Sequence, residues 1–272
     1  MRVRIMGTAA GEGWPALFCS CQACRTARRL KGRNLRSRSS VQIDDVLQIE
    51  LPPDLLCQSL REGVDTAAIS YVLISHSHYD HFAPGDLRWI HPKFARRAGL
   101  HSPSIYASDE VISMIRASLG SACSVELCEL TPFREVSIGR YTVLPIPANH
   151  NVDLNPFNFL VSDGDAAILY ACDTGPYPES TWDGLRGRTA DAFIIECTVG
   201  LDRRGESSPH LGLPNVVEFK SRADVSGLAR VSSHWVITHF SHHSGLLHDE
   251  LVELANIHGL VVGFDGMVFE IP

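Results

Sequence analysis

The segment from Ile74 to His81 constrains this chain more than any other part of its sequence. It reads Ile-Ser-His-Ser-His-Tyr-Asp-His, so three imidazoles and one carboxylate fall close together, directly after the apolar run Tyr71–Ile74. The end of a buried strand is a rigid place to hold ligands, and imidazole together with carboxylate suits zinc, manganese or iron. The pattern therefore predicts a strand that delivers ligands to a hydrolytic centre with two metals.

The bulk properties of the chain indicate an ordinary globular protein. It has 272 residues, 44% of them hydrophobic, and a net charge of −7. This length suits one large domain, which we expect to span residues 1–272. We find no apolar run of about 18 residues, and Met1–Gly7 reads as a strand and not as a signal peptide. We therefore expect a cytoplasmic protein without membrane insertion, and the acidic charge argues against a general nucleic-acid binder.

Apolar runs and their periodicity predict strands first, followed by strands that alternate with helices. The expected strands are Arg2–Met6, Val41–Leu51, Ile69–Ser75, Tyr141–Pro147, Asn158–Ser162, Ala166–Ala171, Ala192–Glu196, His234–Thr238, Leu260–Phe264 and Met267–Ile271. The expected helices are Cys21–Lys31, Asp54–Glu62, Ser108–Leu119, Pro214–Lys220 and Leu247–His258. We expect a hairpin turn at Gly263–Gly266, and we find no internal repeat. Such an order suits sheets covered by helices.

Three further segments have the form of a strand followed by a candidate ligand. His150 follows Pro145–Ala148, Asp173 follows Ile168–Ala171, and His239 follows Trp235–Thr238. Each of them is weak evidence by itself, because a single histidine behind a strand is more often a hydrogen-bonded surface or core residue. Asp-Thr-Gly at residues 173–175 also fits a simple turn. The three candidates become stronger evidence together, because they follow the H-x-H-x-D-H segment in this order along the chain.

Taken in that order, the H-x-H-x-D-H segment, His150, Asp173 and His239 resemble the metallo-β-lactamase superfamily. The resemblance implies a mixed α/β (α+β) fold, a four-layer αββα sandwich, and two divalent metals (zinc, manganese or iron) in the active site. It assigns one metal to His76, His78 and His150. It assigns the other metal to Asp80, His81 and His239, with Asp173 as the bridge and Asp80 also counted as catalytic. Two such metals activate a bridging water and stabilise the attacking and leaving oxygens.

A second candidate metal site lies near the N-terminus. Cys19, Cys21 and Cys24 offer three thiolates, and a closed structural zinc site needs a fourth ligand. His242 follows His239 by three residues, so we hypothesise a structural zinc held by the cysteines and His242, within a loop of about residues 14–38. The C-x-C-x-x-C and H-x-x-H pattern resembles the cyclic phosphodiesterases of the carbon–phosphorus lyase pathway. An iron–sulfur ligand set, a redox cysteine pair and unpaired thiols are the alternatives.

Two residues are candidates for delivering a proton to a leaving oxygen. Glu196 ends an apolar run, and His210 opens a helical stretch 14 residues later. The pair resembles motifs of the transfer-RNA 3′-processing ribonuclease Z branch, which implies that Glu196 orients His210 toward the scissile phosphate. A carboxylate in that place fixes the imidazole tautomer and raises its pKa. The alternative is a strand-end glutamate and a helix-start histidine with structural roles only.

The sequence departs from the family pattern at one place that bears on the metals. Where family members usually carry Asp and Gly, this chain has Glu50 and Pro52, and Asp54 remains. The usual aspartate supports the histidine-rich loop, and glutamate is one methylene longer, so we expect that support to shift. The first set of ligands is otherwise complete. Metal affinity and rate are the properties that this departure affects.

The stretch Arg25–Arg38 is strongly basic. It contains seven basic residues and no acidic one: Arg25, Arg28, Arg29, Lys31, Arg33, Arg36 and Arg38. A solvated helix face and a surface that attracts phosphate are the two explanations.

The function that these patterns favour is a metal-dependent phosphodiesterase for a small phosphodiester of a cyclic or nucleotide-like kind. A lactone or thioester hydrolase of the same fold is the alternative, because the same metals polarise a carbonyl. A non-catalytic zinc-stabilised binding protein and a di-iron oxidoreductase are further alternatives. Beyond the substrate we expect no membrane or nucleic-acid partner, and related phosphodiesterases make a homodimer an option. The natural substrate, the metal and the oligomeric state stay open.

Overall fold

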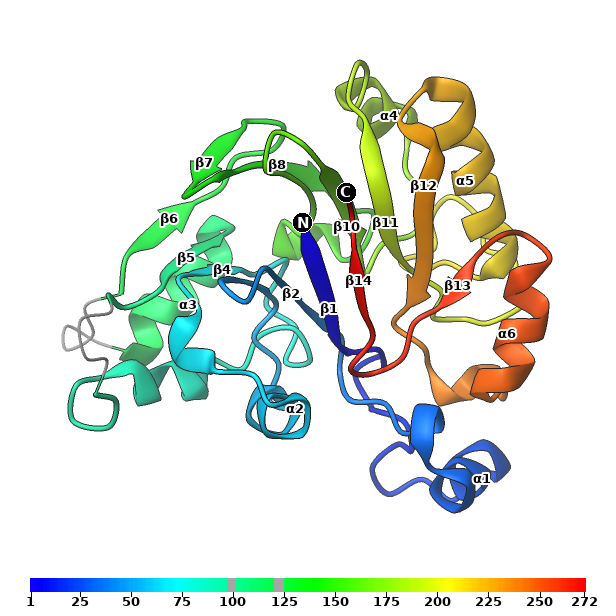
Figure 1. The fold of residues 1–272 in the computed structure, drawn as a ribbon, viewed down its shortest axis with the longest axis horizontal. Coiled ribbons are helices and arrows are strands. Elements are labelled where there is room, and N and C mark those ends of the chain that lie inside the picture. Colours follow the sequence, from blue (N-terminus) through cyan, green and yellow to red (C-terminus); the bar gives the residue numbers. More distant parts are fainter. Residues whose placement is uncertain (97–100, 120–124) are drawn as a thin grey trace.

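The computed structural model describes residues 1–96, 101–119 and 125–272. In this part of the chain two mixed β-sheets pack face to face, and helices cover the outer face of each sheet (Figure 1). The expected four-layer αββα sandwich is therefore confirmed. The two ends of the chain lie side by side, where the Met1 amino group donates to the Ile271 carbonyl at 2.8 Å.

The first sheet combines the N-terminal half of the chain with its last strand. Across this sheet the strands are β14 (Val268–Glu270), β1 (Arg2–Gly7), β2 (Ser40–Ile43), β3 (Leu47–Ile49), β4 (Tyr71–Leu73), β5 (Ser104–Ala107) and β6 (Leu127–Glu129). Across the second sheet they are β13 (Val261–Val262), β12 (Ala229–Thr238), β11 (Ala190–Glu196), β10 (Ala167–Ala171), β9 (Phe157–Ser162), β8 (Tyr141–Pro147) and β7 (Val136–Ile138).

The two sheets share one strand plan over the described residues. From β14 in the first sheet and from β7 in the second, three antiparallel pairings are followed by three parallel ones. β3 and β10 hold the same place, and close behind them Glu50 and Asp173 both have left-handed backbones, with φ of +68° and +51°. The topology thus repeats, although the sequence shows no repeat.

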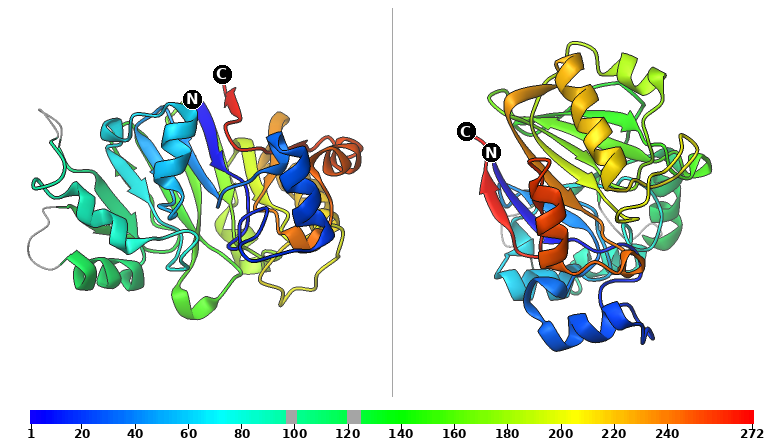
Figure 2. Two further views of the ribbon diagram at one scale, coloured as in Figure 1. Left: turned by 90° about the horizontal axis from the view of Figure 1, so that it is seen from below. Right: turned by 90° about the vertical axis from the view of Figure 1, so that its right-hand side faces the viewer.

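Helices cover the sheets on both sides. They are α1 (Gln22–Leu30), α2 (Leu55–Glu62), α3 (Asp109–Leu119), α4 (Glu179–Gly184), α5 (Leu213–Ser226) and α6 (His248–Asn256). Short 3-10 helices are η1 (Gly32–Asn34), η2 (Thr66–Ala68), η3 (Pro84–Ile90), η5 (Val152–Leu154) and η6 (His242–Ser244). Helix α1 lies beyond the strand ends (Figure 2), where its buried residues Ala23, Cys24 and Ala27 join the apolar cluster of the second sheet. None of the helices in the described ranges is long and apolar enough to cross a membrane.

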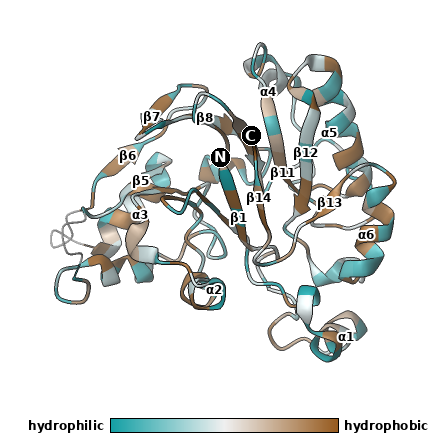
Figure 3. Ribbon diagram, viewed as in Figure 1, coloured by the Kyte–Doolittle hydropathy of each residue, from teal (hydrophilic) through white to brown (hydrophobic). Residues whose placement is uncertain are grey.

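Three apolar clusters join the layers. The central cluster lies between the sheets and includes Ile43 and Phe159. A second cluster includes Trp235 and Phe219 and packs α5 and α6 on the second sheet, and a third includes Ile112 and packs α3 on the first sheet. Figure 3 shows β12 turning from hydrophilic to hydrophobic along its length, and its last four residues are buried. Burial therefore deepens toward the strand end that precedes His239.

Several expected elements are corrected by the structure. The single strand expected at Val41–Leu51 is two strands, β2 and β3, because Asp44 and Asp45 take left-handed backbones and form a tight turn. The turn at Gly263–Gly266 exists, but it joins β13 to β14 in different sheets and is no hairpin. Strands β5, β6 and β7 and helix α4 were not expected. They are short, and short runs carry little periodicity.

Candidate metal centres

The candidate histidine and aspartate ligands gather where neighbouring strands end. The histidine-rich loop follows β4, His150 follows β8, Asp173 follows β10, and His239 follows β12. Asp173 and His239 have left-handed backbones, with φ of +51° and +56°. Non-glycine residues rarely adopt this conformation, and it recurs at functional sites because the surrounding fold enforces it. The two strand ends thus turn their side chains into one common space.

One group of donors consists of three histidines and Asp173. His78 Nδ1 lies 2.9 Å from His76 Nε2 and 3.2 Å from His150 Nε2. Asp173 Oδ2 lies 3.4 Å from His76 Nε2 and 3.5 Å from His150 Nε2. These four ligand atoms lie within 4.8 Å of one another, a spacing that suits donors around one cation.

A second group of donors shares Asp173 with the first. Asp173 Oδ1 lies 3.0 Å from His239 Nε2, and Asp173 Oδ2 lies 3.2 Å from His81 Nε2. Asp80 Oδ2 completes the group at 3.3 Å from His81 Nε2 and 3.7 Å from His239 Nε2. The structure therefore brings all seven predicted ligands together, with the Asp173 carboxylate between the two groups.

Four of the imidazoles are oriented by a partner on their outer side. The Nδ1 atoms face Ser75 Oγ at 2.9 Å in His76, Glu50 Oε1 at 3.3 Å in His81, the Pro209 carbonyl at 3.1 Å in His150, and Thr198 Oγ1 at 2.9 Å in His239. Each ring thereby turns Nε2 toward the shared carboxylate. The contacts at His76, His150 and His239 are hydrogen bonds, whereas the contact of His81 with Glu50 is a close approach without hydrogen-bond geometry. Outer partners that fix the tautomer and the ring orientation are usual for metal-binding histidines.

The inner atoms of the centre are buried without hydrogen bonds. Nε2 of His81, Nε2 of His239 and Oδ1 of Asp173 lack a partner with hydrogen-bond geometry among the described residues. Buried polar atoms of this kind are costly, and a coordinated cation satisfies them. The donor set therefore fits divalent cations.

The charged groups of the centre strongly shift one another's pKa values. Burial opposes a charge on His81, but Asp173, Asp80 and Glu50 outweigh it and raise the pKa of His81 well above its usual value. The same balance of burial against Asp173 raises the pKa of His239. Burial, followed by the His81 charge, lowers the pKa of His76 to about 3. The carboxylates thus favour positive charge in the second donor group, as a cation would supply.

Glu50 keeps its contact with the histidine-rich loop despite the added methylene. Its side chain is completely buried, Oε2 accepts from the Ser75 amide at 3.1 Å, and Oε1 lies 3.3 Å from His81 Nδ1. The left-handed backbone at Glu50 places the longer side chain so that it reaches both groups. Asp54, by contrast, turns away to Arg38, whose amide donates to it at 2.9 Å.

The predicted pair Glu196 and His210 lies beside the second donor group. His210 Nδ1 is 3.1 Å from Glu196 Oε1, which also accepts from the Thr174 amide at 2.6 Å. Burial opposes a charge on His210, but Glu196 outweighs it and raises the pKa of the imidazole. His210 lines a cavity of about 460 Å³ together with His78, His150 and His239. The imidazole is therefore positioned to meet a molecule bound at the centre.

Sequence reasoning missed the role of Thr198. Its hydroxyl lies 2.5 Å from Glu196 Oε2 and 2.9 Å from His239 Nδ1, so Glu196 is linked to a predicted ligand as well as to His210. The available signal was the spacing, because residues two apart at a strand end share a face.

The loop that carries His210 packs tightly against the Asp173 turn. A Cβ atom at Gly175 would lie 1.6 Å from the Ser208 carbonyl oxygen, so only glycine allows this approach. Asn149 donates to the Glu206 carbonyl at 2.7 Å and ties the same loop to the His150 turn. The loop that carries His210 is thus fixed to two of the turns that carry ligands.

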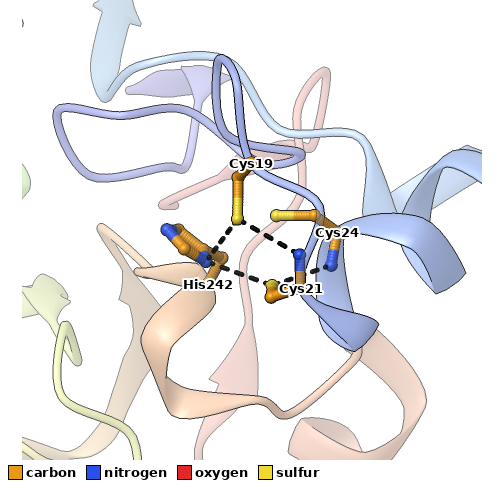
Figure 4. A group of neighbouring side chains, drawn as sticks. All are labelled: Cys19, Cys21, Cys24 and His242. Carbon is orange, nitrogen blue, oxygen red and sulfur yellow. Dashed lines mark hydrogen bonds between the residues drawn. The ribbon is translucent and has the colours of Figure 1, made fainter.

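The cysteines of the N-terminal loop gather around His242 (Figure 4). His242 Nδ1 lies 3.5 Å from Cys21 Sγ and 3.8 Å from Cys19 Sγ, and the Cys24 amide donates to Cys21 Sγ at 3.4 Å. That amide and the neighbouring His242 lower the pKa of Cys21 to about 6, whereas burial raises the pKa of Cys24 to about 11. Three sulfurs and one imidazole within 4.8 Å suit a closed tetrahedral zinc site.

The basic stretch matches neither explanation in full. Arg36 is buried and donates to Thr8 Oγ1 at 2.8 Å and to the Gly263 carbonyl at 2.6 Å. Arg28 donates to the Cys19 carbonyl at 2.8 Å, and Arg38 pairs with Asp54 at 3.0 Å. These arginines hold the cysteine loop and its surroundings in place and do not form an open surface for phosphate.

Comparison with known proteins agrees with this fold. A family model described as the Beta-lactamase superfamily domain matches residues 49–240. Two curated relatives, from Methylobacterium radiotolerans and an Azoarcus species, are both named Coenzyme PQQ synthesis protein B. The first is 36% identical over 95 residues, which cover 30% of this chain and only 32% of that protein. The second is 23% identical and is matched over 100% of both chains.

Solved structures resemble the chain over its whole length. Zinc-bound PqqB from Methylobacterium extorquens superimposes with a TM-score of 0.77 at 17% identity and full coverage of both chains. A diphosphatase of the PhnP family superimposes with a TM-score of 0.73 at 23% identity, covering 100% of this chain and 98% of that one. At these identities the likeness establishes the fold.

Proposed function

Since the chain belongs to the beta-lactamase superfamily, we propose that it is a metal-dependent hydrolase that cleaves small phosphodiesters. The observation that carries the proposal is the contact of 3.1 Å between Glu196 and His210, at the edge of a cavity that also exposes the candidate metal ligands. A phosphodiester needs a proton for its leaving oxygen, and an oriented imidazole supplies one.

The two donor groups would hold two divalent cations (zinc, manganese or iron). His76, His78, His150 and Asp173 form one group, and Asp80, His81, Asp173 and His239 form the other. When bound, such cations supply Lewis acidity to water and to phosphoryl oxygens. The Asp173 carboxylate approaches both groups, with Oδ2 near His76 and His81 and Oδ1 near His239, which supports a shared, dinuclear site.

His210 would act as the proton donor. Glu196 holds its Nδ1 atom, which leaves Nε2 for the leaving oxygen of a substrate in the cavity. Glu196 is completely buried and accepts four contacts, from the Thr174 amide, the Leu211 amide, the Thr198 hydroxyl and His210. A carboxylate fixed in this way orients the imidazole and favours its protonated form.

The Cys19, Cys21, Cys24 and His242 group would hold one structural zinc. Its role would be to fix the loop of residues 14–38 against the wall of the cavity, which Glu12 and Ser241 line. Four protein ligands leave no open position for chemistry, so this zinc would support the fold and not the reaction.

The test is a substrate panel with the metal-loaded protein. We expect hydrolysis of bis(p-nitrophenyl) phosphate and of a 2′,3′-cyclic nucleotide, and none of a simple lactone. The variant His210→Gln is expected to lose roughly 100- to 10,000-fold in kcat, because general acid catalysis is removed, while its metal content stays unchanged. His258→Gln, on the exposed surface, is the matched control. Hydrolysis of lactones without phosphodiester cleavage, or full activity of His210→Gln, would contradict the proposal.

The curated relatives support a second candidate, a role in the synthesis of coenzyme PQQ. Both relatives carry that name, and one of them is matched over the whole of both chains. The experiment is complementation of a bacterium that lacks its own protein B. Restored production of coenzyme PQQ would favour this role, and failure to restore it would leave the phosphodiesterase as the better explanation.

A further inference from the structure

A second cavity of about 460 Å³ lies outside the reaction centre, between helices α4 and α5 on the second sheet (Figure 1). This volume falls in the range of pockets that enclose whole small molecules. Among the residues that the structure describes, the wall of the second cavity includes none of the candidate metal ligands, and His210 does not line it either. A molecule bound there is therefore not placed for hydrolysis, and the proposed reaction gives this cavity no role.

The floor of the second cavity is aromatic. Tyr177, Trp182 and Phe219 line it, and their ring centroids lie 5.8, 5.0 and 4.8 Å apart in edge-to-face or tilted arrangements. The Tyr177 hydroxyl donates to Asn158 Oδ1 at 2.6 Å, so the polar atom of the floor is satisfied within the protein. Aromatic rings of this kind pack favourably against a further ring, edge to face or offset. The floor thus favours a ligand with a planar, apolar body.

Two arginines stand at the rim above this floor. Arg222 lies over the Trp182 ring, 4.6 Å from its centroid, and donates to Glu179 Oε1 at 2.8 Å. Arg203 pairs with Glu218 at 2.5 Å, and their side chains are 69% and 49% exposed. Exposed ion pairs contribute little free energy, so the carboxylate of a ligand replaces Glu218 at small cost. The arginine guanidinium binds a carboxylate through two parallel hydrogen bonds, which makes Arg203 the natural anchor for such a group.

The loop that carries Arg203 is fixed to helix α5. The neighbouring Arg204 amide donates to Asn215 Oδ1 at 2.9 Å, and Asn215 Nδ2 donates to the Arg204 carbonyl at 2.9 Å. Asn215 is buried at the start of α5. A Cβ atom at Gly212 would lie 1.9 Å from the Asp202 carbonyl oxygen, so glycine allows the loop to fold back on the helix. The backbone of the rim is therefore preformed, which lowers the entropic cost of binding a ligand.

The balance of charge on the wall limits the charge of the ligand. Three arginines and three glutamates line the second cavity, so the wall is neutral before a ligand binds, and a polyanion would meet the glutamates as well as the arginines. We propose that this cavity binds a small planar aromatic molecule with a single carboxylate. Its ring lies against Phe219, and its carboxylate pairs with Arg203. The site is separate from the reaction centre and does not rest on the proposed function.

Three probes test the two halves of this proposal by calorimetry with the metal-loaded protein. They are 2-naphthoate, its neutral analogue 2-naphthalenemethanol, and cyclohexanecarboxylate, which has the charge without the aromatic ring. We expect 2-naphthoate to bind at one site and more tightly than either of the others. Arg203→Gln is expected to raise the Kd of 2-naphthoate by roughly 10- to 100-fold, the value of a charge-assisted contact, and to leave the Kd of the alcohol unchanged. Phe219→Leu is expected to weaken 2-naphthoate and the alcohol alike, by about 2- to 10-fold.

Arg186→Gln is the matched control for Arg203→Gln. Arg186 is also an exposed arginine with an acidic partner, because it pairs with Asp183 at 2.7 Å, but it does not line this cavity. The control is expected to leave the Kd of all three probes unchanged. An equal loss of 2-naphthoate and the alcohol in Arg203→Gln would overturn the proposed ion pair, since the residue would then only support the loop. The absence of 2-naphthoate binding to the wild type would overturn the site altogether.

A carboxylate also binds to metal ions, so a further variant separates the second cavity from the candidate metal centre. Asp173→Asn changes the centre and leaves the residues around the second cavity as they are. It is expected to bind 2-naphthoate as tightly as the wild type, with the same dependence on Arg203 in the double variant. Loss of binding in Asp173→Asn, together with full binding in Arg203→Gln, would place the probe on the metals and refute the inference.

Discussion

The two candidate metal centres of this molecule are built in opposite ways. In the His/Asp centre the ligands follow four strands, and His76, His81, Asp173 and His239 are buried. In the Cys/His centre three ligands come from the short segment Cys19–Cys24, which ends in the first turn of α1. Cys21 is exposed, and His242 is the fourth member of the group. The strands of the two sheets position the ligands of the His/Asp centre, whereas the ligands of the Cys/His centre help to hold a loop in place. The comparison suggests that one centre serves chemistry and the other serves the fold.

The centres are nevertheless neighbours. His239 and His242 belong to one segment, and between the centres the Ser241 hydroxyl donates to Glu12 at 2.5 Å. Glu12 Oε1 in turn lies 3.8 Å from His242 Nε2. Variants that perturb one centre at a time therefore show whether one centre serves chemistry and the other serves the fold, although the two lie so close together. The four that follow are ordered by their expected effect on the rate of hydrolysis.

Asp173→Asn is expected to have the largest effect. The amide keeps the shape of the side chain but removes the charge that both donor groups share, so hydrolysis should fall to background and about two metals per chain should be lost. Metal analysis, a bis(p-nitrophenyl) phosphate assay and circular dichroism measure this, with exposed Asp165→Asn as the control. Retention of both metals would show that Asp173 is no bridge.

Glu50→Gln is expected to follow, through the orientation of His81. Loss of the carboxylate beside His81 Nδ1 should weaken metal binding by roughly 10- to 100-fold, and excess metal should restore much of the rate. Metal titration of the apo protein measures the affinity, and Glu129→Gln on β6 is the exposed control. An unchanged affinity would mean that Ser75 and the loop backbone suffice.

Thr198→Val is expected to reduce the rate by about tenfold. The substitution keeps the branched shape but removes the hydroxyl that joins Glu196 to His239, so both metal affinity and the orientation of His210 should suffer slightly. Steady-state kinetics at saturating metal separate the two, because only the contribution of His210 persists there. Thr142→Val, exposed on β8, is the control. A rate equal to that of the wild type would remove Thr198 from the site.

Cys24→Ala is expected to change the rate least and the stability most. About one zinc per chain should be lost, and the midpoint of thermal unfolding should fall by roughly 5–10 °C, whereas kcat of the folded protein should change less than about threefold. Metal analysis and calorimetry test this, with Cys57→Ala on α2 as the control. A large loss of kcat at full stability would erase the distinction between the centres.

The sequence predicted the class of fold because its strongest signals are local. A histidine-rich loop behind an apolar strand, and ligands behind three later strands, indicate a sheet edge that carries metal ligands. Short elements such as β5 and α4 were missed, and a turn at Asp44 and Asp45 was read as continuous strand. The repeated plan of the two sheets was also invisible. It resides in strand pairing, which different side chains support equally well.

By itself the sequence determined which donor atoms the chain offers and which class of fold could gather them. Only the tertiary structure decided what lies behind each donor: Glu50 behind His81, Thr198 between Glu196 and His239, and Asn215 around Arg204. The physical reason is that side-chain chemistry is a local property, whereas partners distant in the chain meet only through strand register and loop packing. Residues with ordinary roles in the sequence therefore acquire specific ones in the fold.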